Sequence, residues 1–265
     1  MKKNKIIVVR NLSKYFKKIK AVDNISLDVE KGSIFAFLGP NGAGKSTTIK
    51  MLTTLLIPSS GEIIIDNLDC LKNKSEVRKA FGIVFQDQSL DDELTAYENL
   101  DFHGALYSVP KVLRQERIMN SLQLVNLSER ENDFVKTFSG GMKRRLEIAR
   151  GLIHHPKILF LDEPTLGLDP QTRNNIWGHI KQLNKEEQMT IFFTTHYMPE
   201  AEQIADKIAI IDYGKIIAQG TLAQIKEKSK SKSLDEAFLS LTGRSIRDEN
   251  ATSLDRMRMK RRLRR

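Results

Sequence analysis

The sequence predicts an α/β fold with a mixed or largely parallel central sheet, an antiparallel β subdomain and an inserted helical subdomain. Three observations support this. Uninterrupted apolar runs within residues 33–38, 157–161 and 190–195 are typical of strands buried on both faces, as in parallel sheets. Alternating apolar and polar residues at 21–29 indicate a half-buried strand. Residues 87–156 instead show the three-to-four-residue apolar spacing of helices.

The first apolar run leads into a glycine-rich loop. Residues 39–47 fill the pattern G-x-x-x-x-G-K-[ST], and residues 48–56 read as a helix. Strand, loop and helix in this order are the context that a phosphate-binding loop requires. Glycines let backbone N–H groups approach phosphate oxygens at the positive end of the helix. The expected nucleotide-binding residues are Gly39, Pro40, Asn41, Gly42, Ala43, Gly44, Lys45, Ser46 and Thr47.

Two side chains of this loop carry chemistry. Lys45 is expected to place its charge on the β- and γ-phosphates of a nucleotide, and Ser46 to offer a hydroxyl oxygen to Mg²⁺. The alternative is a glycine-rich turn with a solvated lysine. The flanking strand and helix disfavour that alternative.

Two strands are expected before the loop, at residues 5–10 and 21–29. Tyr15 and Phe16 lie between them. An aromatic ring at this place can stack on a nucleotide base, because every base offers a π-face, or it can simply pack beside a strand. A further strand is expected at residues 62–66, after a turn.

Gln86 follows the short apolar strand expected at residues 81–85, and side chains at strand ends commonly point into sites in α/β folds. The helical segment that begins there contains two expected helices, at 96–107 and 111–125. Three histidines of this segment have no metal-ligand spacing and are interpreted as structural or surface residues. They are His103, His154 and His155.

A second informative stretch runs from Phe138 to Arg150. Ser139 is a good N-cap, and Gly140 and Gly141 leave the first turn of the following helix unshielded, so that its N–H groups face outward. Such a helix end suits an anion. A capped amphipathic helix with no ligand is the alternative.

Two carboxylates end the apolar run at 157–161. Asp162 and Glu163 are therefore expected at the carboxyl edge of the central sheet, beside the phosphate loop. Asp162 can hold Mg²⁺ directly or through water, and Glu163 can orient and deprotonate an attacking water. Solvated carboxylates at a strand end are the alternative.

The C-terminal third of the chain adds one more polar side chain to this edge. Pro170 is well placed to open a helix, and His196 directly follows the strand expected at 190–195. A β-hairpin is expected at 207–220, and a small helix at 234–241.

Composition limits the class of protein. A chain of 265 residues with 40% hydrophobic and 29% charged residues is expected to be globular, with one large or two modest domains. No apolar run reaches the ~18 residues that a transmembrane helix needs, and the protein is therefore expected to lie in the cytosol. A single cysteine, Cys70, excludes an internal disulfide and any Cys-based metal cluster.

The net charge of +10 is concentrated at one end. Residues 256–265 contain seven Lys and Arg, which leaves 36 against 33 carboxylates in the rest of the chain. The basic tail is interpreted as a solvated end, with contact to anionic lipid headgroups as the alternative. No specific nucleic-acid binding is expected.

The motifs GPNGAGKST, Gln86, FSGGM, ILFLDEP, GLDP and His196, in this order, resemble the nucleotide-binding subunit of ATP-binding cassette (ABC) transporters over residues 5–222. FSGGMKRRLEIA, LDPQTRNNIW and LDEAFLSLTGRSIRD resemble the daunorubicin-resistance branch in particular. The resemblance implies the P-loop NTPase ABC ATPase fold, with ATP and Mg²⁺ bound. The sequence departs from the family signature at Phe138 and Met142, where Leu and Gln are usual.

The resemblance also implies residue roles. Lys45, Gln86, Glu163 and His196 are implied to be catalytic, with Ser46, Gln86 and Asp162 around the metal. Gln86 is further implied to couple the nucleotide to the membrane partner. A second copy in a head-to-tail pair is implied to present Ser139, Gly140 and Gly141 to ATP, with Asp169 bridging the two sites. Phe16 aligns best with the base-stacking aromatic, and Tyr15 remains an alternative.

The expected function is therefore that of an ATP-hydrolysing subunit that powers a separate membrane permease in export, at the cytoplasmic face of the membrane. Drug, lipid and polysaccharide cargoes are all compatible with the sequence. A soluble ATPase of the same family acting on nucleic acid or ribosomes is the alternative. Residues 1–222 are expected to form the nucleotide-binding domain, with the helical subdomain at about 87–156, and residues 223–265 a small C-terminal extension.

Overall fold

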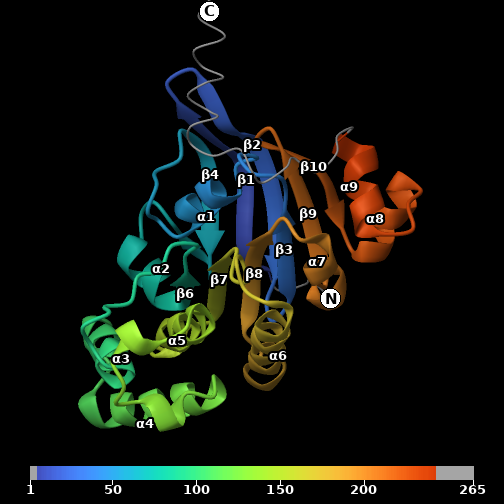
Figure 1. The fold of residues 1–265 in the computed structure, drawn as a ribbon. Helices are drawn as coiled ribbons and strands as arrows, with labels where there is room; N and C mark the ends of the chain where they lie inside the picture. Colours follow the sequence, from blue (N-terminus) through green and yellow to red (C-terminus); the bar gives the residue numbers. More distant parts are fainter. Residues whose placement is uncertain (1–4, 243–265) are drawn as a thin grey trace, which may run out of the picture.

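The computed structural model describes residues 5–242, and its centre is a six-stranded sheet (Figure 1). The strand order is β10-β9-β3-β8-β7-β6. Neighbouring strands from β9 to β6 pair in parallel, and β10 pairs with β9 antiparallel. The sheet is thus mixed, as predicted. Its strands are β3 (Ile34–Leu38), β6 (Phe81–Val84), β7 (Ile158–Asp162), β8 (Thr190–Thr195), β9 (Lys207–Asp212) and β10 (Lys215–Gly220).

A four-stranded antiparallel sheet of order β2-β1-β4-β5 forms a second layer. The first two strands are longer than predicted, because β1 includes Tyr15 and Phe16 and pairs with β2 up to the register Phe16↔Ile19. The prediction that both aromatics lie between two strands was therefore wrong. Cross-strand pairing continues there through a mixture of charged and apolar residues, such as Tyr15↔Lys20 and Phe16↔Ile19, that shows no regular apolar alternation. The strands are β1 (Lys5–Phe16), β2 (Ile19–Glu30), β4 (Ser60–Ile65) and β5 (Leu68–Asp69).

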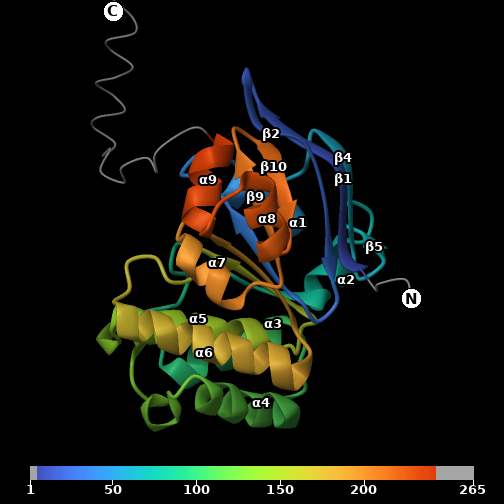
Figure 2. The same cartoon turned by 90° about the vertical axis from the view of Figure 1, so that its right-hand side faces the viewer.

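Helices pack against the central sheet, and α3, α4 and α5 lie together at its lower end (Figures 1 and 2). Helical elements occupy the stretch between β6 and β7, as predicted for residues 87–156: α3 (Ala96–Leu106), α4 (Lys111–Leu124), η1 (Ser128–Arg130), η2 (Val135–Thr137) and α5 (Gly140–Leu152). The other helices are α1 (Lys45–Leu52), α2 (Lys74–Ala80), α6 (Pro170–Glu187), α7 (Met198–Ile204), α8 (Leu222–Ser229) and α9 (Leu234–Thr242).

The central sheet is buried on both faces. Along β3, Phe35 and Phe37 join a core cluster shared with the antiparallel sheet and α1. Ile34, Ala36 and Leu38 join the other cluster, which contains residues of α3 to α9. The absence of polar alternation in this strand follows from that two-sided burial. The polar ends of the strands therefore stand out as the positions where the sheet meets solvent or a ligand.

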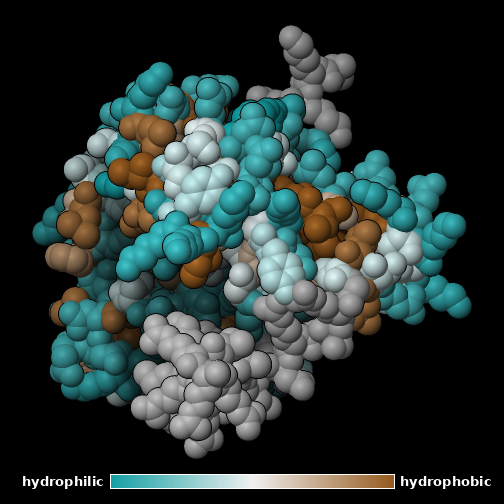
Figure 3. Space-filling view, turned by 90° about the horizontal axis from the view of Figure 1, so that it is seen from above, coloured by the Kyte–Doolittle hydropathy of each residue, from teal (hydrophilic) through white to brown (hydrophobic). Residues whose placement is uncertain are grey.

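The C-terminal helices pack on the same core as the sheet. Ile225 of α8 and Leu234 and Phe238 of α9 belong to the cluster on the helical face. Residues 256–265, the basic tail of the sequence analysis, lie outside the described residues. Viewed from above, much of the visible surface is hydrophilic, with apolar side chains in separate groups (Figure 3). Within residues 5–242, no helix has both the length and the apolar content needed to cross a bilayer.

Two of the three histidines of the helical segment are structural, as predicted. The His154 ring stacks on Tyr107 at 3.9 Å between centroids, and Nε2 of His154 donates to the carbonyl oxygen of Phe81 at 2.8 Å. The His103 ring lies 5.0 Å from that of Tyr107. Burial, helped by the charge of Arg150, lowers the pKa of His103 to about 4. Burial likewise lowers the pKa of His154.

This burial predicts a loss of stability in mild acid. Unfolded histidine takes up a proton below about pH 6.5, whereas folded His103 stays neutral down to about pH 4. The free energy of unfolding should therefore fall as the pH drops through this window, by about 1–2 kcal/mol at pH 5 for this histidine. Urea unfolding at pH 7 and pH 5 should show a smaller difference for His103→Gln than for the parent. Equal differences would contradict the assignment.

Candidate functional site

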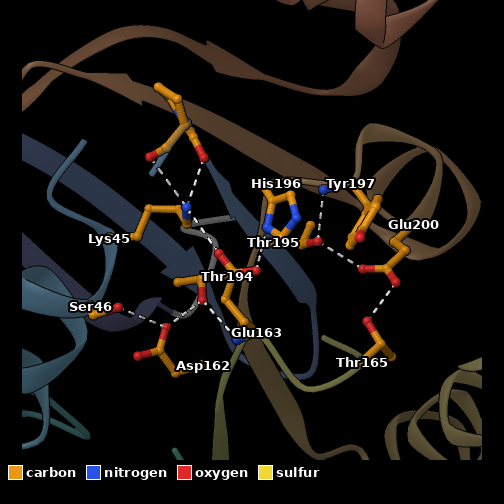
Figure 4. Close-up of polar contacts among 12 residues, drawn as sticks. Lys45, Ser46, Asp162, Glu163, Thr165, Thr194, Thr195, His196, Tyr197 and Glu200 are labelled. Carbon is orange, nitrogen blue, oxygen red and sulfur yellow. Dashed lines mark hydrogen bonds and ion pairs between the residues drawn. The ribbon is translucent and has the colours of Figure 1, made fainter. Parts of the chain in front are cut away.

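The loop after β3 holds a buried lysine at the first position of α1. Gly44 caps the helix with a φ of +112°, and a Cβ there would lie 2.5 Å from the carbonyl oxygen of Ala21. Only glycine fits this position. Lys45 is 5% exposed. Its Nζ donates to the carbonyl oxygen of Gly39 at 2.7 Å and forms an ion pair with Oε1 of Glu163 at 3.0 Å (Figure 4).

Asp162 lies at the end of β7, two strands away from β3. Thr194 of the intervening strand β8 donates to Oδ1 of Asp162 at 2.6 Å, and Ser46 of α1 donates to the same oxygen at 3.3 Å. Asp162 is buried. The parallel order β3-β8-β7 thus brings the phosphate loop and the strand-end carboxylate together, as the sequence predicted.

Glu163 leaves the sheet in an unusual backbone conformation. Its φ is +51°, in the left-handed region that non-glycine residues rarely adopt. Its N–H donates to the carbonyl and hydroxyl oxygens of Thr194 at 3.2 and 3.0 Å, which hold this conformation in place. Oε2 of Glu163 lies 2.5 Å from Nδ1 of His196, which follows β8. Outliers of this kind concentrate at functional sites.

The electrostatics of this cluster favour an ionised carboxylate. Burial by itself would raise the pKa of Glu163, but the hydrogen bond from His196 and the charge of Lys45 outweigh it. The pKa of this carboxyl is therefore lowered. At neutral pH Glu163 is a carboxylate able to accept a proton.

Gln86 is not joined to this cluster. Its side chain is exposed, and within residues 5–242 it makes no hydrogen bond to Lys45, Ser46 or Asp162. The carbonyl oxygens of Phe85 and Gln86 instead accept from Arg144 of α5, at 2.5 and 3.1 Å. These hydrogen bonds hold the loop after β6 against α5 of the helical segment.

Ser139 and Asp169 cap two neighbouring helices. Oγ of Ser139 accepts from the N–H of Met142 at 3.3 Å, and Oδ1 of Asp169 accepts from the N–H of Thr172 at 3.0 Å. Hydrogen bonds from the side chain and from the backbone N–H of Thr172 lower the pKa of Asp169. A Cβ on Gly141 would lie 2.6 Å from Cγ2 of Thr172, so the start of α5 packs closely on the first turn of α6. Both caps are exposed.

The two aromatic candidates lie at the tip of the β1–β2 hairpin, which projects from the top of the molecule (Figure 1). Tyr15 is 40% and Phe16 45% exposed. Nζ of Lys14 lies 5.3 Å from the Phe16 ring, and Nζ of Lys20 lies 5.7 Å from the Tyr15 ring. Neither ring is buried in a hydrophobic core.

Sequence reasoning missed several residues that shape the site. Thr194 bonds both Asp162 and the backbone of Glu163, and Thr195 bonds the buried carboxylate of Glu200 at 2.8 Å. Two adjacent hydroxyls at the end of an otherwise apolar strand were the available signal. No local pattern indicated where the partners of these hydroxyls lie.

A phosphate loop whose lysine meets a strand-end carboxylate across a mixed sheet defines the class of P-loop nucleoside triphosphatases. Comparison with known proteins gives the family. The ABC transporter family profile matches residues 22–166. The chain belongs to the ABC transporter family. It is the ATP-binding, ATP-hydrolysing subunit of such a transporter.

Characterised relatives agree with this assignment. The linearmycin resistance ATP-binding protein LnrL of Bacillus subtilis is 44% identical over 216 residues, which cover 82% of this chain and 69% of LnrL. The daunorubicin/doxorubicin resistance ATP-binding protein DrrA of Streptomyces peucetius is 41% identical over 220 residues, covering 83% of this chain and 66% of DrrA. The predicted resemblance to the daunorubicin-resistance type is confirmed.

A solved structure shows the same fold. The dimeric ATP-binding cassette MJ0796, bound to ADP and Pi in a post-hydrolysis state, superimposes with a TM-score of 0.73. It is 29% identical, and the match covers 82% of this chain and 98% of that one. The predicted fold class is therefore confirmed.

Proposed function

We propose that this protein is the ATP-hydrolysing subunit of an export transporter and that it drives a separate membrane permease. The buried group formed by Lys45, Asp162, Glu163 and His196 carries the proposal, because it combines a phosphate-binding charge with an ionised base. The names of LnrL and DrrA state resistance to linearmycin and to daunorubicin and doxorubicin, and we infer from them that this chain serves in export.

The proposed roles follow from the contacts. The N–H groups of residues 39–47 bind the phosphates, and Lys45 neutralises their charge. Glu163 takes the proton of the attacking water. His196, 2.5 Å from Glu163, orients that carboxylate and reaches the terminal phosphate. Hydrolysis would then depend on groups that already lie within hydrogen-bond distance of one another.

The residues present fit a magnesium ion. Oγ of Ser46 and Oδ1 of Asp162 lie 3.3 Å apart, and hard oxygen donors of this kind are what Mg²⁺ prefers. When bound, the metal would neutralise phosphate charge during hydrolysis. We propose Gln86 as a further ligand, which requires its exposed side chain to turn toward Asp162.

We further propose that two copies pair head to tail. Gly140 and Gly141 begin α5, a helix of 13 residues whose positive end suits an anion. With Ser139 and Asp169 they form an exposed polar surface of capped helix starts. The dimeric state of MJ0796 supports the pairing of two copies.

The adenine base is proposed to stack on Phe16, with Tyr15 as the alternative on the same hairpin. Stacking on one aromatic side chain contributes about 1–3 kcal/mol per base. Equilibrium binding of ATP to Phe16→Ala and to Tyr15→Ala would decide between the two rings.

An exposed apolar pair on α3 suits a membrane partner. Phe102 and Leu106, one helical turn apart, are 62% and 66% exposed. Large exposed apolar side chains that lie together mark interaction surfaces. We propose that the permease docks here and thereby holds the protein at the cytoplasmic face of the membrane. Lipid contact through the basic tail remains a proposal on sequence grounds alone.

Charge on this pair should detach the protein from its partner. Phe102→Glu combined with Leu106→Glu would place two carboxylates in the proposed interface, and unpaired charges there cost several kcal/mol in total. Co-purification with the permease from membranes should fall by about 10-fold or more. ATP hydrolysis by the purified subunit should stay at the parent rate.

A matched control lies on the far side of the molecule. Leu239 of α9 is 39% exposed, and Leu239→Glu adds a carboxylate away from α3 (Figure 1). It should leave co-purification unchanged. Equal recovery of the permease with the α3 double variant would contradict the docking proposal.

The nucleic-acid alternative is not favoured, because the family match is to transporters. We propose residues 1–222 as the nucleotide-binding domain, with its helical subdomain at about 87–156. Residues 223–265 are proposed as an extension whose described helices, α8 and α9, share the core of the sheet.

A further inference from the structure

Glu200 of α7 is a buried carboxylate outside the group that binds and cleaves the nucleotide. It is 4% exposed. Its Oε1 accepts from Oγ1 of Thr165 at 2.5 Å, and its Oε2 accepts from Oγ1 of Thr195 at 2.8 Å (Figure 4). A buried charge is costly unless its oxygens are satisfied. This carboxylate therefore fixes the positions of both hydroxyls.

The two threonines belong to the segments that carry the reactive pair. Thr165 lies two residues after Glu163, in the loop beyond β7, and Thr195 directly precedes His196 at the end of β8. Oγ1 of Thr195 also accepts from the N–H of Tyr197 at 3.0 Å, which leaves its proton directed at Glu200. One carboxylate thus joins two strand ends.

A third element approaches the same carboxylate. Nε of Arg173, on the first turns of α6, lies 3.5 Å from Oε1 of Glu200. The Arg173 guanidinium lies over the Tyr197 ring at 4.5 Å, and the Tyr197 ring is 4.2 Å from that of His196. The histidine is therefore supported from its backbone, through Thr195, and from the side of its ring.

We propose that Glu200 is a positioning residue for ATP hydrolysis. By holding Thr165 and Thr195 it keeps the imidazole of His196 and the carboxylate of Glu163 at hydrogen-bond distance, without touching either. The inference rests on the proposed function, since it assumes that Glu163 and His196 act in hydrolysis. It assigns to Glu200 the alignment of that pair.

Glu200→Gln is the sharpest test, because it keeps the volume of the side chain. A carboxylate only accepts hydrogen bonds, and here it faces three donors. The amide removes the charge that pairs with Arg173 and forces one threonine hydroxyl to accept a hydrogen bond from NH₂ instead of donating one, so the link to one strand end would be weakened and shifted. We expect kcat to fall by about 10-fold or more, since small misplacements of reacting groups are costly. The KM for ATP should stay within about twofold of the parent value, because the phosphate loop is untouched.

The matched control is Glu202→Gln on the same helix. Oε1 of Glu202 pairs with Nζ of Lys226 at 2.9 Å and accepts from the N–H of Leu234 at 2.7 Å. These contacts reach α8 and α9, not the strand ends. This variant should keep the parent kcat.

A double-mutant comparison separates positioning from general loosening of the fold. If Glu200 aligns His196 with Glu163, adding Glu200→Gln to His196→Ala should lower the single-turnover rate of ATP cleavage by much less than Glu200→Gln lowers it in the parent. A structural defect would instead multiply the two losses. Should Glu200→Gln fail to fold, Thr165→Val removes one of the two hydroxyls. It should lower kcat, and Thr165→Ser should restore it.

The inference is supported if Glu200→Gln lowers kcat at constant KM while Glu202→Gln does not, and if this loss is much smaller in the His196→Ala background. Rescue of Thr165→Val by Thr165→Ser supports it as well. Parent-like kcat in Glu200→Gln or Thr165→Val, or multiplied losses, overturns it. If in that case Glu163→Gln still abolishes turnover, the proposed function stands. A parent protein that does not hydrolyse ATP overturns both.

Discussion

Glu163→Gln should abolish most ATP hydrolysis while keeping ATP binding. An amide cannot take the proton of the attacking water, and general-base catalysis contributes about 100-fold or more to the rate. The side chain keeps its size, and its oxygen can still accept from Nζ of Lys45, which lies 3.0 Å from the carboxylate. Steady-state phosphate release and equilibrium binding of ATP, measured on the same preparation, check the two halves of this expectation.

Glu163→Gln should also accumulate as an ATP-dependent dimer. If hydrolysis reopens a pair of subunits, a pair that cannot hydrolyse stays closed. Size-exclusion chromatography with and without ATP should show the dimer only with ATP. Asp162→Asn offers a contrast, because it alters the proposed metal ligand and should weaken the Mg²⁺ dependence of binding. Hydrolysis at the parent rate by Glu163→Gln would exclude this residue as the base.

Lys45→Met should remove most of the affinity for ATP. The ammonium group is 5% exposed and supplies a buried positive charge at the phosphate loop. Truncating one partner of a buried, hydrogen-bonded charge pair costs about 2–5 kcal/mol, which corresponds to a Kd raised by about 30-fold or more. Isothermal titration with ATP would measure the change directly.

A matched control exists on the same helix. Lys50 also lies on α1 but is exposed, so Lys50→Met makes the same chemical change away from the loop. It should bind ATP like the parent. Comparable affinities for Lys45→Met and Lys50→Met would mean that the loop lysine does not bind the phosphates.

Much of the fold followed from local patterns in the sequence. Apolar runs without polar alternation predicted β3, β7 and β8, because both faces of those strands are buried. Short, weakly apolar elements were missed, including α2 and α7. The β1–β2 hairpin extends further than predicted, since backbone pairing continues to Phe16↔Ile19 through residues that show no regular apolar alternation.

For the site, the sequence alone determined which chemical groups are available: a glycine-rich loop ending in Lys45, and carboxylates and a histidine placed at strand ends. Motif spacing is sufficient for that, because the chemistry of each group is local. Only the tertiary structure decided which groups meet. The order β3-β8-β7 brings Ser46 and Thr194 to the same oxygen of Asp162, and α7 brings Glu200 to Thr165 and Thr195. Such contacts join residues far apart in the chain, and their partners are chosen by strand order and burial, which no local pattern encodes.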